Sequence, residues 1–333
     1  MVSKTRNVPA LMDVARRAGV GAATVSRVIN GGQNVSSGTL AAVQKAIKEL
    51  GYHPNHAARS LKGARTKTIG LIVPSVADPF FSTAAAAIQD VARAHGSLVL
   101  LAASDNLPAR EQEQVLTLIQ RRIDGLILAP SDAADIEMFE HAGFPVVCFD
   151  RPFAHHRLST VLGDNYGGAK AATEHLVRSG RKRILCMGGD NKLFTSERRV
   201  SGHRDVIRAA GLPYLAELNV QDYASTEMAL RPYLQGKERI DAIFSIKNAI
   251  TVNAYRILRQ SNIPIPRRIA LVGYDDFELA DTLDPPICVV RQPIADIATR
   301  AADMLFQALE TGEEKSRTVT MKVELMHRAS CGL

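Results

Sequence analysis

Two patterns of hydrophobic and polar positions divide the chain. Up to about residue 50, apolar residues recur three or four positions apart, as they do on one face of an α-helix. From Thr68 onward, short runs of β-branched and aliphatic residues alternate with helical stretches. We therefore expect an all-α N-terminal part followed by an α/β body.

The N-terminal part predicts three short helices. Residues 12–18 place their apolar side chains on one face, Gly19 can adopt a left-handed turn, and residues 24–29 resume the helical pattern. Ser36 is a candidate N-cap for a third helix over Ser37–Leu50, which would end at Gly51. Its expected apolar face comprises Leu40, Val43, Ile47 and Leu50. The first two helices form a helix-turn-helix pattern, although a helical hairpin without a role on DNA has the same spacing.

The body is expected to contain parallel sheets. Seven apolar runs have the length of buried strands, and helical stretches separate them, which indicates right-handed βαβ units. The runs are residues 69–73, 98–101, 125–128, 146–149, 183–186, 240–244 and 269–272. Their number and the length of the segment suit two doubly wound lobes.

Polar residues follow several of these runs. Ligands of doubly wound sheets bind beyond the carboxyl ends of the strands, so these residues are candidates for a binding site. Asp, Arg and amide groups can hold sugar hydroxyls by paired hydrogen bonds, while an aromatic ring covers an apolar face. The candidates are Asp78, Phe80, Phe81, Asp150, Arg151, Arg199, Lys247, Asp275 and Gln292. Without a further constraint, each polar candidate is more readily explained as a helix cap or as part of a surface ion pair.

The charge distribution singles out the N-terminal part. Residues 1–66 contain ten Lys or Arg and two acidic residues, a net charge of +8, whereas the whole chain carries only +7. A small basic module on a nearly neutral body is typical of proteins that bind the phosphate backbone of nucleic acids. A solvated basic surface that keeps the protein soluble is the other interpretation.

Composition excludes several classes of protein. No segment has the apolar length of a signal peptide or a membrane span, so we expect a cytoplasmic protein with no membrane contact. The four cysteines, Cys148, Cys186, Cys288 and Cys331, lack metal-ligand spacing and are expected to be unpaired thiols. The neighbouring His155 and His156 lack a third ligand. We find no catalytic motif, and expect no enzyme activity, no cofactor and no metal site.

Three segments of the sequence give more specific information than these patterns. The segments DVARRAGV and TVSRVIN, followed by VSSGTLAAVQKAIKELGYHPNHAARSLKG, closely resemble the headpiece of the lactose-repressor family of bacterial transcription regulators. The similarity continues over essentially the whole chain. It implies a helix-turn-helix headpiece over residues 1–54, a hinge helix and linker over 55–67, and a periplasmic-binding-protein-like body over 68–333. The implied lobes are 68–164 with 294–314, and 165–293 with 315–330, with crossings near Asp164, Pro293 and Glu314.

The resemblance also implies which residues meet DNA. It assigns them to Ala22, Ala23, Thr24, Ser26, Arg27, Asn30, Asn34 and Ser36 and, in the hinge, to Asn55, Ala58 and Leu61. Arg27 is the strongest candidate for base readout, because its guanidinium fork can pair with O6 and N7 of guanine. The two alanines can only contact thymine methyl groups or let the helix lie deeper in the groove. Gly21 stands where the family usually has a capping Ser, a weaker cap by a few tenths of a kcal/mol. Leu61 is expected to wedge into the minor groove, unless it only packs against the body.

In the body, the resemblance assigns effector contacts to Asp150, Arg199, Lys247, Asp275 and Gln292, with Arg151 as an addition typical of pentose binders. Lys247-Asn248 departs from the Asn-Asp or Asn-Asn of many relatives. A lysine in a dry cleft needs a counter-charge. We therefore hypothesise an anionic effector, a sugar acid or sugar phosphate, although Asp150 or Asp275 can equally supply that charge.

Together these features predict a homodimeric transcription regulator, a repressor, on a pseudo-palindromic operator at the nucleoid. A sugar, sugar acid or sugar phosphate bound between the lobes would control it through the hinge. A solute receptor of the transport type would share the two lobes, but it needs an export signal and has no use for residues 1–66. An enzyme on the same sheets would need an acid, a base or a nucleophile with supporting partners in the cleft.

Overall fold

The computed structural model describes residues 9–29, 35–52, 65–131, 143–153, 158–189, 192–236, 239–313 and 316–332. The chain divides into two compact units, Met1–Thr66 and Lys67–Leu333. Several residues singled out above lie outside the described ranges: Asn30, Asn34, Asn55, Ala58, Leu61, His155 and His156.

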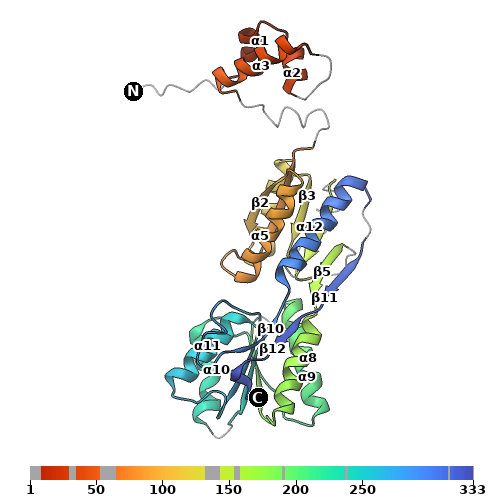
Figure 1. Ribbon diagram of the computed structural model, residues 1–333. Helices are drawn as coiled ribbons and strands as arrows, with labels where there is room; N and C mark the ends of the chain where they lie inside the picture. The colour runs from red at the N-terminus through yellow and green to blue at the C-terminus, as the bar shows by residue number, and fades with distance from the viewer. Residues whose placement is uncertain are drawn as a thin grey trace. The chain divides into compact units, whose positions relative to one another are not determined.

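The first unit contains the three expected helices, α1 (Leu11–Ala18), α2 (Ala22–Ile29) and α3 (Ser37–Leu50) (Figure 1). Gly19 and Gly51 have φ angles of 68° and 60°, the left-handed conformation that ends a helix at low cost for glycine. Ser36 caps α3 by accepting a hydrogen bond from the backbone N–H of Thr39. The core is built on Val14, Ala15, Val25, Val43, Ala46 and Tyr52. Leu40, expected on the apolar face, is instead 40% exposed at the N-terminal end of α3.

The first lobe of the second unit has a six-stranded sheet in the order β11-β5-β4-β3-β1-β2, with parallel pairing throughout. Its strands are β1 (Thr68–Val73), β2 (Leu98–Ala103), β3 (Gly125–Leu128), β4 (Val146–Phe149), β5 (Ser159–Gly163) and β11 (Thr318–Met321). Helices α5 (Pro79–Ala94) and α12 (Ile294–Thr311) cover one face, and α6 (Pro108–Gln120) packs against the other. Burial on both faces explains why the central strands are continuous apolar runs.

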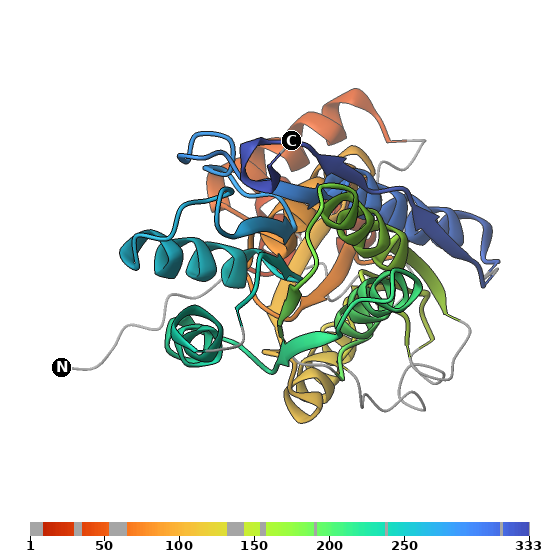
Figure 2. The same ribbon diagram turned by 90° about the horizontal axis from the view of Figure 1, so that it is seen from below.

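The second lobe has a six-stranded sheet in the order β12-β10-β9-β8-β6-β7. Its strands are β6 (Ile184–Gly188), β7 (Leu215–Leu218), β8 (Ala242–Ser245), β9 (Ala270–Tyr274), β10 (Cys288–Arg291) and β12 (Glu324–Met326). All pairs are parallel except β10 with β12. Helices α8 (Asn165–Arg178) and α9 (Phe194–Ala209) cover one face, and α10 (Tyr223–Gln235) and α11 (Asn248–Gln260) cover the other (Figure 2). The predicted fold class, a helical headpiece and two doubly wound lobes, is confirmed.

The chain passes between the two sheets three times. Two passages lie where they were expected, at Asp164 between β5 and α8 and at Pro293 between β10 and α12. The third was expected near Glu314, but β11 still pairs with β5 of the first sheet, so the chain crosses between Met321 and Glu324. An edge strand of four partly exposed residues lacks the apolar run that marks a buried strand, which is why the pattern did not place it.

The cysteines differ from expectation in one respect. Cys148 and Cys186 are free and buried, as predicted. Cys288 and Cys331 instead form a disulfide, so the expectation of four unpaired thiols is wrong for this pair. The short 3-10 helix η1 (Ala329–Cys331) returns to β10 across 43 residues of sequence, a proximity that residue spacing does not reveal.

Candidate functional site

A polar cleft lies between the carboxyl ends of the two sheets. Its cavity has a volume of about 510 Å³ and is lined by residues that follow β1, β2 and β4 in the first lobe and β6, β7, β8 and β9 in the second. This is the position that parallel sheets offer to ligands. The cleft brings together most of the predicted binding residues: Asp78, Phe80, Phe81, Asp150, Arg151, Arg199, Lys247 and Asp275. Gln292 does not line it.

Arg199 organises the second lobe's side of the cleft. Its guanidinium donates to Asp275 at 3.0 Å, to the carbonyl of Ile246 at 2.7 Å and to Asn165 at 2.7 Å, and it lies over the ring of Tyr274. Burial opposes this charge, but Asp275 above all, with Tyr274 and Asp150, outweighs burial and raises the pKa of Arg199. The guanidinium is therefore a cation held in place in the lining of the cavity.

Gln292 acts on the cleft through Asp275. Its Nε2 donates to Asp275 at 2.7 Å, and its side chain is buried at the crossing between the lobes. The carboxylate is thus held by Arg199 on one oxygen and by Gln292 on the other. Gln292, predicted as an effector contact, instead lies behind the residue that lines the cavity.

Asp150 and Arg151 form the corresponding pair in the first lobe. Arg151 Nε donates to Asp150 at 3.3 Å, and its Nη1 donates to Asn106 at 3.0 Å. Both side chains of the pair are buried. Burial raises the pKa of Asp150, although Arg151 and Arg199 act in the opposite direction. A ligand hydroxyl that donates to this carboxylate would replace the hydration that burial removes.

Aromatic rings form an apolar wall beside these charges. Asp78 caps α5 by accepting from the backbone N–H of Phe80 at 3.1 Å, which fixes the first turn of the helix. The rings of Phe80 and Phe81 lie edge to face with centroids 5.1 Å apart, and Phe149 stacks behind Phe80. Carboxylates, guanidinium groups and an aromatic wall are the usual elements of a sugar site.

Lys247 has a counter-charge in the other lobe, Asp78, which is not among the partners predicted from the sequence. Its Nζ lies 3.8 Å from Oδ2 of Asp78, across the cleft in the other lobe, and its side chain is 50% exposed. The alternatives considered from the sequence, Asp150 and Asp275, are paired with arginines. Among the described residues, the lining also contains no excess of basic side chains, since its aspartates are Asp78, Asp105, Asp150 and Asp275 and its cations are Arg151, Arg199 and Lys247.

Several lining residues were missed by the sequence analysis. Asp105 and Asn106 follow β2 in the left-handed conformation, with φ angles of 52° and 57°. The rule that located Asp150 applies equally to the second apolar run, so these two could have been found. Ser196 and Gln221 also line the cavity, but no adjacent strand pattern distinguishes them from other polar residues.

Helix α2 is the second candidate site. Ala23 and Arg27 are exposed and four residues apart, so they share one face of the helix. Thr24 and Ser26 are half-buried. Ala22 is also half-buried and packs against the core of the first unit, so less of it is available to a base edge than of Ala23.

Comparisons with known proteins assign both units to the same family. Residues 10–55 match the family model "Bacterial regulatory proteins, lacI family", and residues 66–329 match "Periplasmic binding proteins and sugar binding domain of LacI family". The chain is 30% identical over 326 residues to the ribose operon repressor of Haemophilus influenzae, covering 96% of this chain and 98% of that protein.

Solved structures show the same architecture. One described as a complex of the transcriptional regulator CelR with cellobiose is 32% identical, with a TM-score of 0.73 and coverage of 97% of this chain and 99% of that one. The lac repressor dimer bound to operator and the anti-inducer ONPF has a TM-score of 0.86 at 24% identity, with the same coverage. At 24% identity, the similarity to the lac repressor structure shows a shared fold and nothing more.

Proposed function

The chain belongs to the LacI family of bacterial regulatory proteins and is a DNA-binding transcription regulator, and we propose that it represses transcription as a homodimer controlled by a neutral sugar. Members of this family regulate transcription and are not enzymes. The observation that carries the proposal is the cleft, where two buried arginine–carboxylate pairs face each other from the two lobes. Relatives named for ribose and cellobiose support a sugar as effector.

We prefer a neutral sugar to a sugar acid or sugar phosphate. The anionic form was inferred from a lysine without a partner, but Lys247 lies beside Asp78 and is half-exposed to water. An added anion would also meet the four aspartates of the lining. Hydroxyl groups, by contrast, can donate to Asp150 and Asp275 and accept from Arg151 and Arg199 at once.

Residues 1–54 would bind DNA, and residues 55–67 would form the hinge. Arg27, with Ala23 beside it, would meet base edges in the major groove, where Arg pairs with guanine O6 and N7. Thr24, Ser26 and Ser36 would lie near phosphates, as would Asn30 and Asn34. Asn55, Ala58 and Leu61 would contact the minor groove, with Leu61 as the wedge. Leu61→Ala should then weaken operator binding without changing the stability of the body.

The exposed edge of the first sheet supports a dimer. Strand β2 ends the sheet, and its Leu98 and Leu101 are 63% and 41% exposed. An exposed apolar edge strand offers a surface on which another chain can pair. A second copy would cover this edge and bring two headpieces to the two halves of an operator. The lac repressor structure of similar fold is also a dimer bound to operator. None of the helices in the described ranges could cross a bilayer, and we propose that the dimer resides in the cytoplasm with the DNA.

Control would follow from thermodynamic linkage between sugar binding in the cleft and operator binding by the headpieces. A ligand that contacts residues of both lobes stabilises the arrangement in which both sets of contacts are made. The same arrangement would alter how the two hinges are held, so sugar and operator would affect each other's binding by one coupling free energy. A solute receptor of the transport type is not favoured, because it leaves the helix-turn-helix match over residues 10–55 without a role.

The direct test is a thermal-shift screen of the full chain against neutral sugars and their acid and phosphate derivatives. A neutral sugar is expected to raise the melting temperature, and Arg199→Met is expected to abolish the shift. Stabilisation by acids or phosphates alone would contradict the neutral effector, and the absence of any stabilising sugar would contradict the cleft as a sugar site. Repeating the screen with operator DNA present gives the sign of the coupling.

A further inference from the structure

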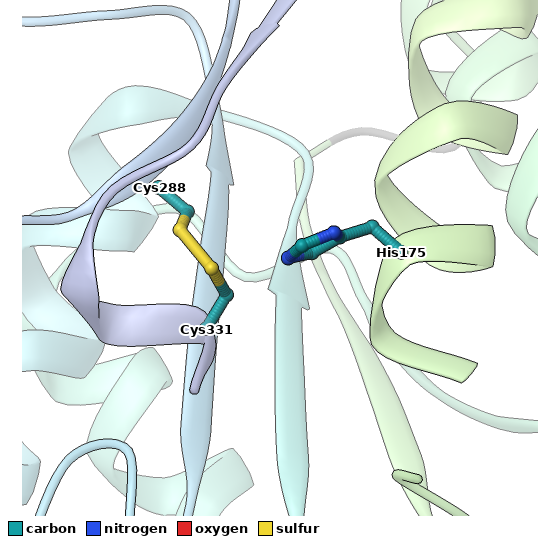
Figure 3. A group of neighbouring side chains, drawn as sticks. All are labelled: His175, Cys288 and Cys331. Carbon is teal, nitrogen blue, oxygen red and sulfur yellow. A yellow bond between two sulfur atoms is a disulfide. The ribbon is translucent and has the colours of Figure 1, made fainter. Parts of the chain in front are cut away.

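A second cluster of reactive side chains lies away from the cleft, on the α8 side of the second lobe. His175 of α8, Cys288 at the start of β10 and Cys331 of η1 offer one nitrogen and two sulfur atoms, all within 4.8 Å of one another. Figure 3 shows the imidazole of His175 directed from its helix toward the sulfur pair. All three residues are buried. The cleft residues do not include any of them, so the proposed sugar response leaves the cluster unused.

We propose that the reduced chain binds a thiophilic divalent metal ion, of the Zn²⁺ type, through Cys288, Cys331 and His175. The disulfide between the cysteines is then the metal-free, oxidised form of the same site. On binding, each thiol loses its proton to solvent and gives its sulfur lone pair to the ion, as the imidazole gives its nitrogen lone pair. No electron is transferred in this step.

The unpartnered nitrogen of His175 is the observation that points to a ligand. Its Nε2 is buried and has no hydrogen-bond partner among the described residues, an arrangement that costs free energy. The disulfide satisfies the two sulfur atoms but leaves this nitrogen alone, whereas a metal ion would bind all three atoms.

The chemistry of the donors selects the class of ion. Two thiolates and one imidazole suit Zn²⁺ and similar ions, while Mg²⁺ and Ca²⁺ prefer oxygen. Two thiolates also cancel the charge of a divalent ion, so the buried site would carry no net charge. The exposed His327, whose ring centroid lies 4.6 Å from that of His175, or a water molecule can take the fourth tetrahedral position.

The surrounding backbone holds the sulfur atoms together without the disulfide. Ser330, between the two chain segments, accepts from the backbone N–H of Cys288 at 2.8 Å and donates to the carbonyl of Leu271 at 2.5 Å. The backbone N–H of Arg328 lies 3.1 Å from Cys288 Sγ, where it can donate to a thiolate, as groups around metal ligands commonly do. Reduction therefore leaves η1 against β9 and β10 with both thiols in place.

The test uses the full chain, reduced with a phosphine, freed of reductant and titrated with Co²⁺ without oxygen. We expect about one equivalent to bind with a thiolate-to-cobalt charge-transfer band, which Zn²⁺ then displaces. Cys331→Ser should abolish the band, and His175→Gln should weaken binding by more than about 100-fold, since even residues around metal ligands cost 10–100-fold. Cys186→Ser, which removes a buried free thiol of the same lobe, should bind Co²⁺ like the parent chain.

The oxidised parent chain is a second control, and it carries no substitution that could impair folding. A diazene oxidant that takes two electrons and two protons from the thiols should abolish Co²⁺ binding. A spectrum without the charge-transfer band, or equal binding by the oxidised chain or by Cys331→Ser, would overturn the proposal. Neither sugar nor DNA enters this experiment, so its outcome is independent of the regulatory function proposed above.

Discussion

The buried pair of Arg199 and Asp275 allows stability and effector binding to be separated. Arg199→Met removes the cation and leaves the carboxylate of Asp275 buried beside Gln292 alone. Losing one partner of a buried ion pair costs about 3–5 kcal/mol, because the remaining charge has no counter-charge. We expect a loss of this size in the free energy of unfolding, a large part of the stability of an ordinary domain.

The double variant Arg199→Met/Asp275→Asn should recover part of that loss. It removes both charges, so no uncompensated ion stays buried, and we expect a coupling free energy of about 2 kcal/mol from the double-mutant cycle. Urea unfolding of the four chains measures this energy. Arg198→Met is the matched control, since Arg198 is the exposed neighbour on α9 and lies 5.1 Å from the ring of Tyr166. Its loss should cost about 1 kcal/mol or less.

Effector binding should not recover in the double variant. The sugar found by thermal shift should bind the Arg198→Met chain normally and the double variant at least ~100-fold more weakly, a loss of about 3 kcal/mol in calorimetric titrations. Two results would refute the reasoning. Additive effects within about 0.5 kcal/mol would show that the pair is not coupled, and normal sugar affinity in the stable double variant would remove Arg199 from the site.

Three further predictions concern other parts of the chain. His203 is fully buried, and burial lowers its pKa from 6.5 to about 4. The stability that this pKa shift contributes is complete above pH 6.5 and is lost as the pH falls toward 4. Unfolding at pH 5 should therefore show about 2 kcal/mol of acid destabilisation, which His203→Leu removes. An unchanged pH profile in that variant would contradict the assignment. Lys247→Met breaks a half-exposed ion pair worth at most about 1 kcal/mol, so neutral-sugar affinity should change by less than about fivefold in calorimetry, whereas a much larger loss would show that Lys247 contacts the sugar directly. Arg27→Ala should cost about 1–3 kcal/mol on the preferred duplex in fluorescence anisotropy, and an equal loss on unrelated duplexes would assign Arg27 to the phosphate backbone.

Local signals in the sequence predicted much of the fold and part of the cleft. Gly19 and Gly51 act through their own backbone geometry and Ser36 through its own hydroxyl, so the C-terminus of α1 and both ends of α3 followed from residue type. Asp150 and Asp275 directly follow buried strands, a position that depends only on the order of elements along the chain.

Features that depend on how distant segments pack together could not be predicted from local sequence signals. The counter-charge of Lys247 is on the opposite lobe, and Gln292 reaches the cleft only through Asp275. The pairing of β11 with β5 decides where the chain crosses between the sheets. The approach of Cys331 to Cys288 likewise depends on how the C-terminal segment docks, which no local pattern encodes.

The most direct test of the regulatory account measures both sides of the linkage. Duplexes selected from a random library by the full chain should contain two related half-sites, and their dissociation constant should change at least ~10-fold when the stabilising sugar is added. Calorimetry of the sugar with and without that duplex should give the same factor, because the coupling free energy is reciprocal. Selection of no common sequence, or a sugar that binds the cleft and leaves the affinity for DNA unchanged, would contradict the account.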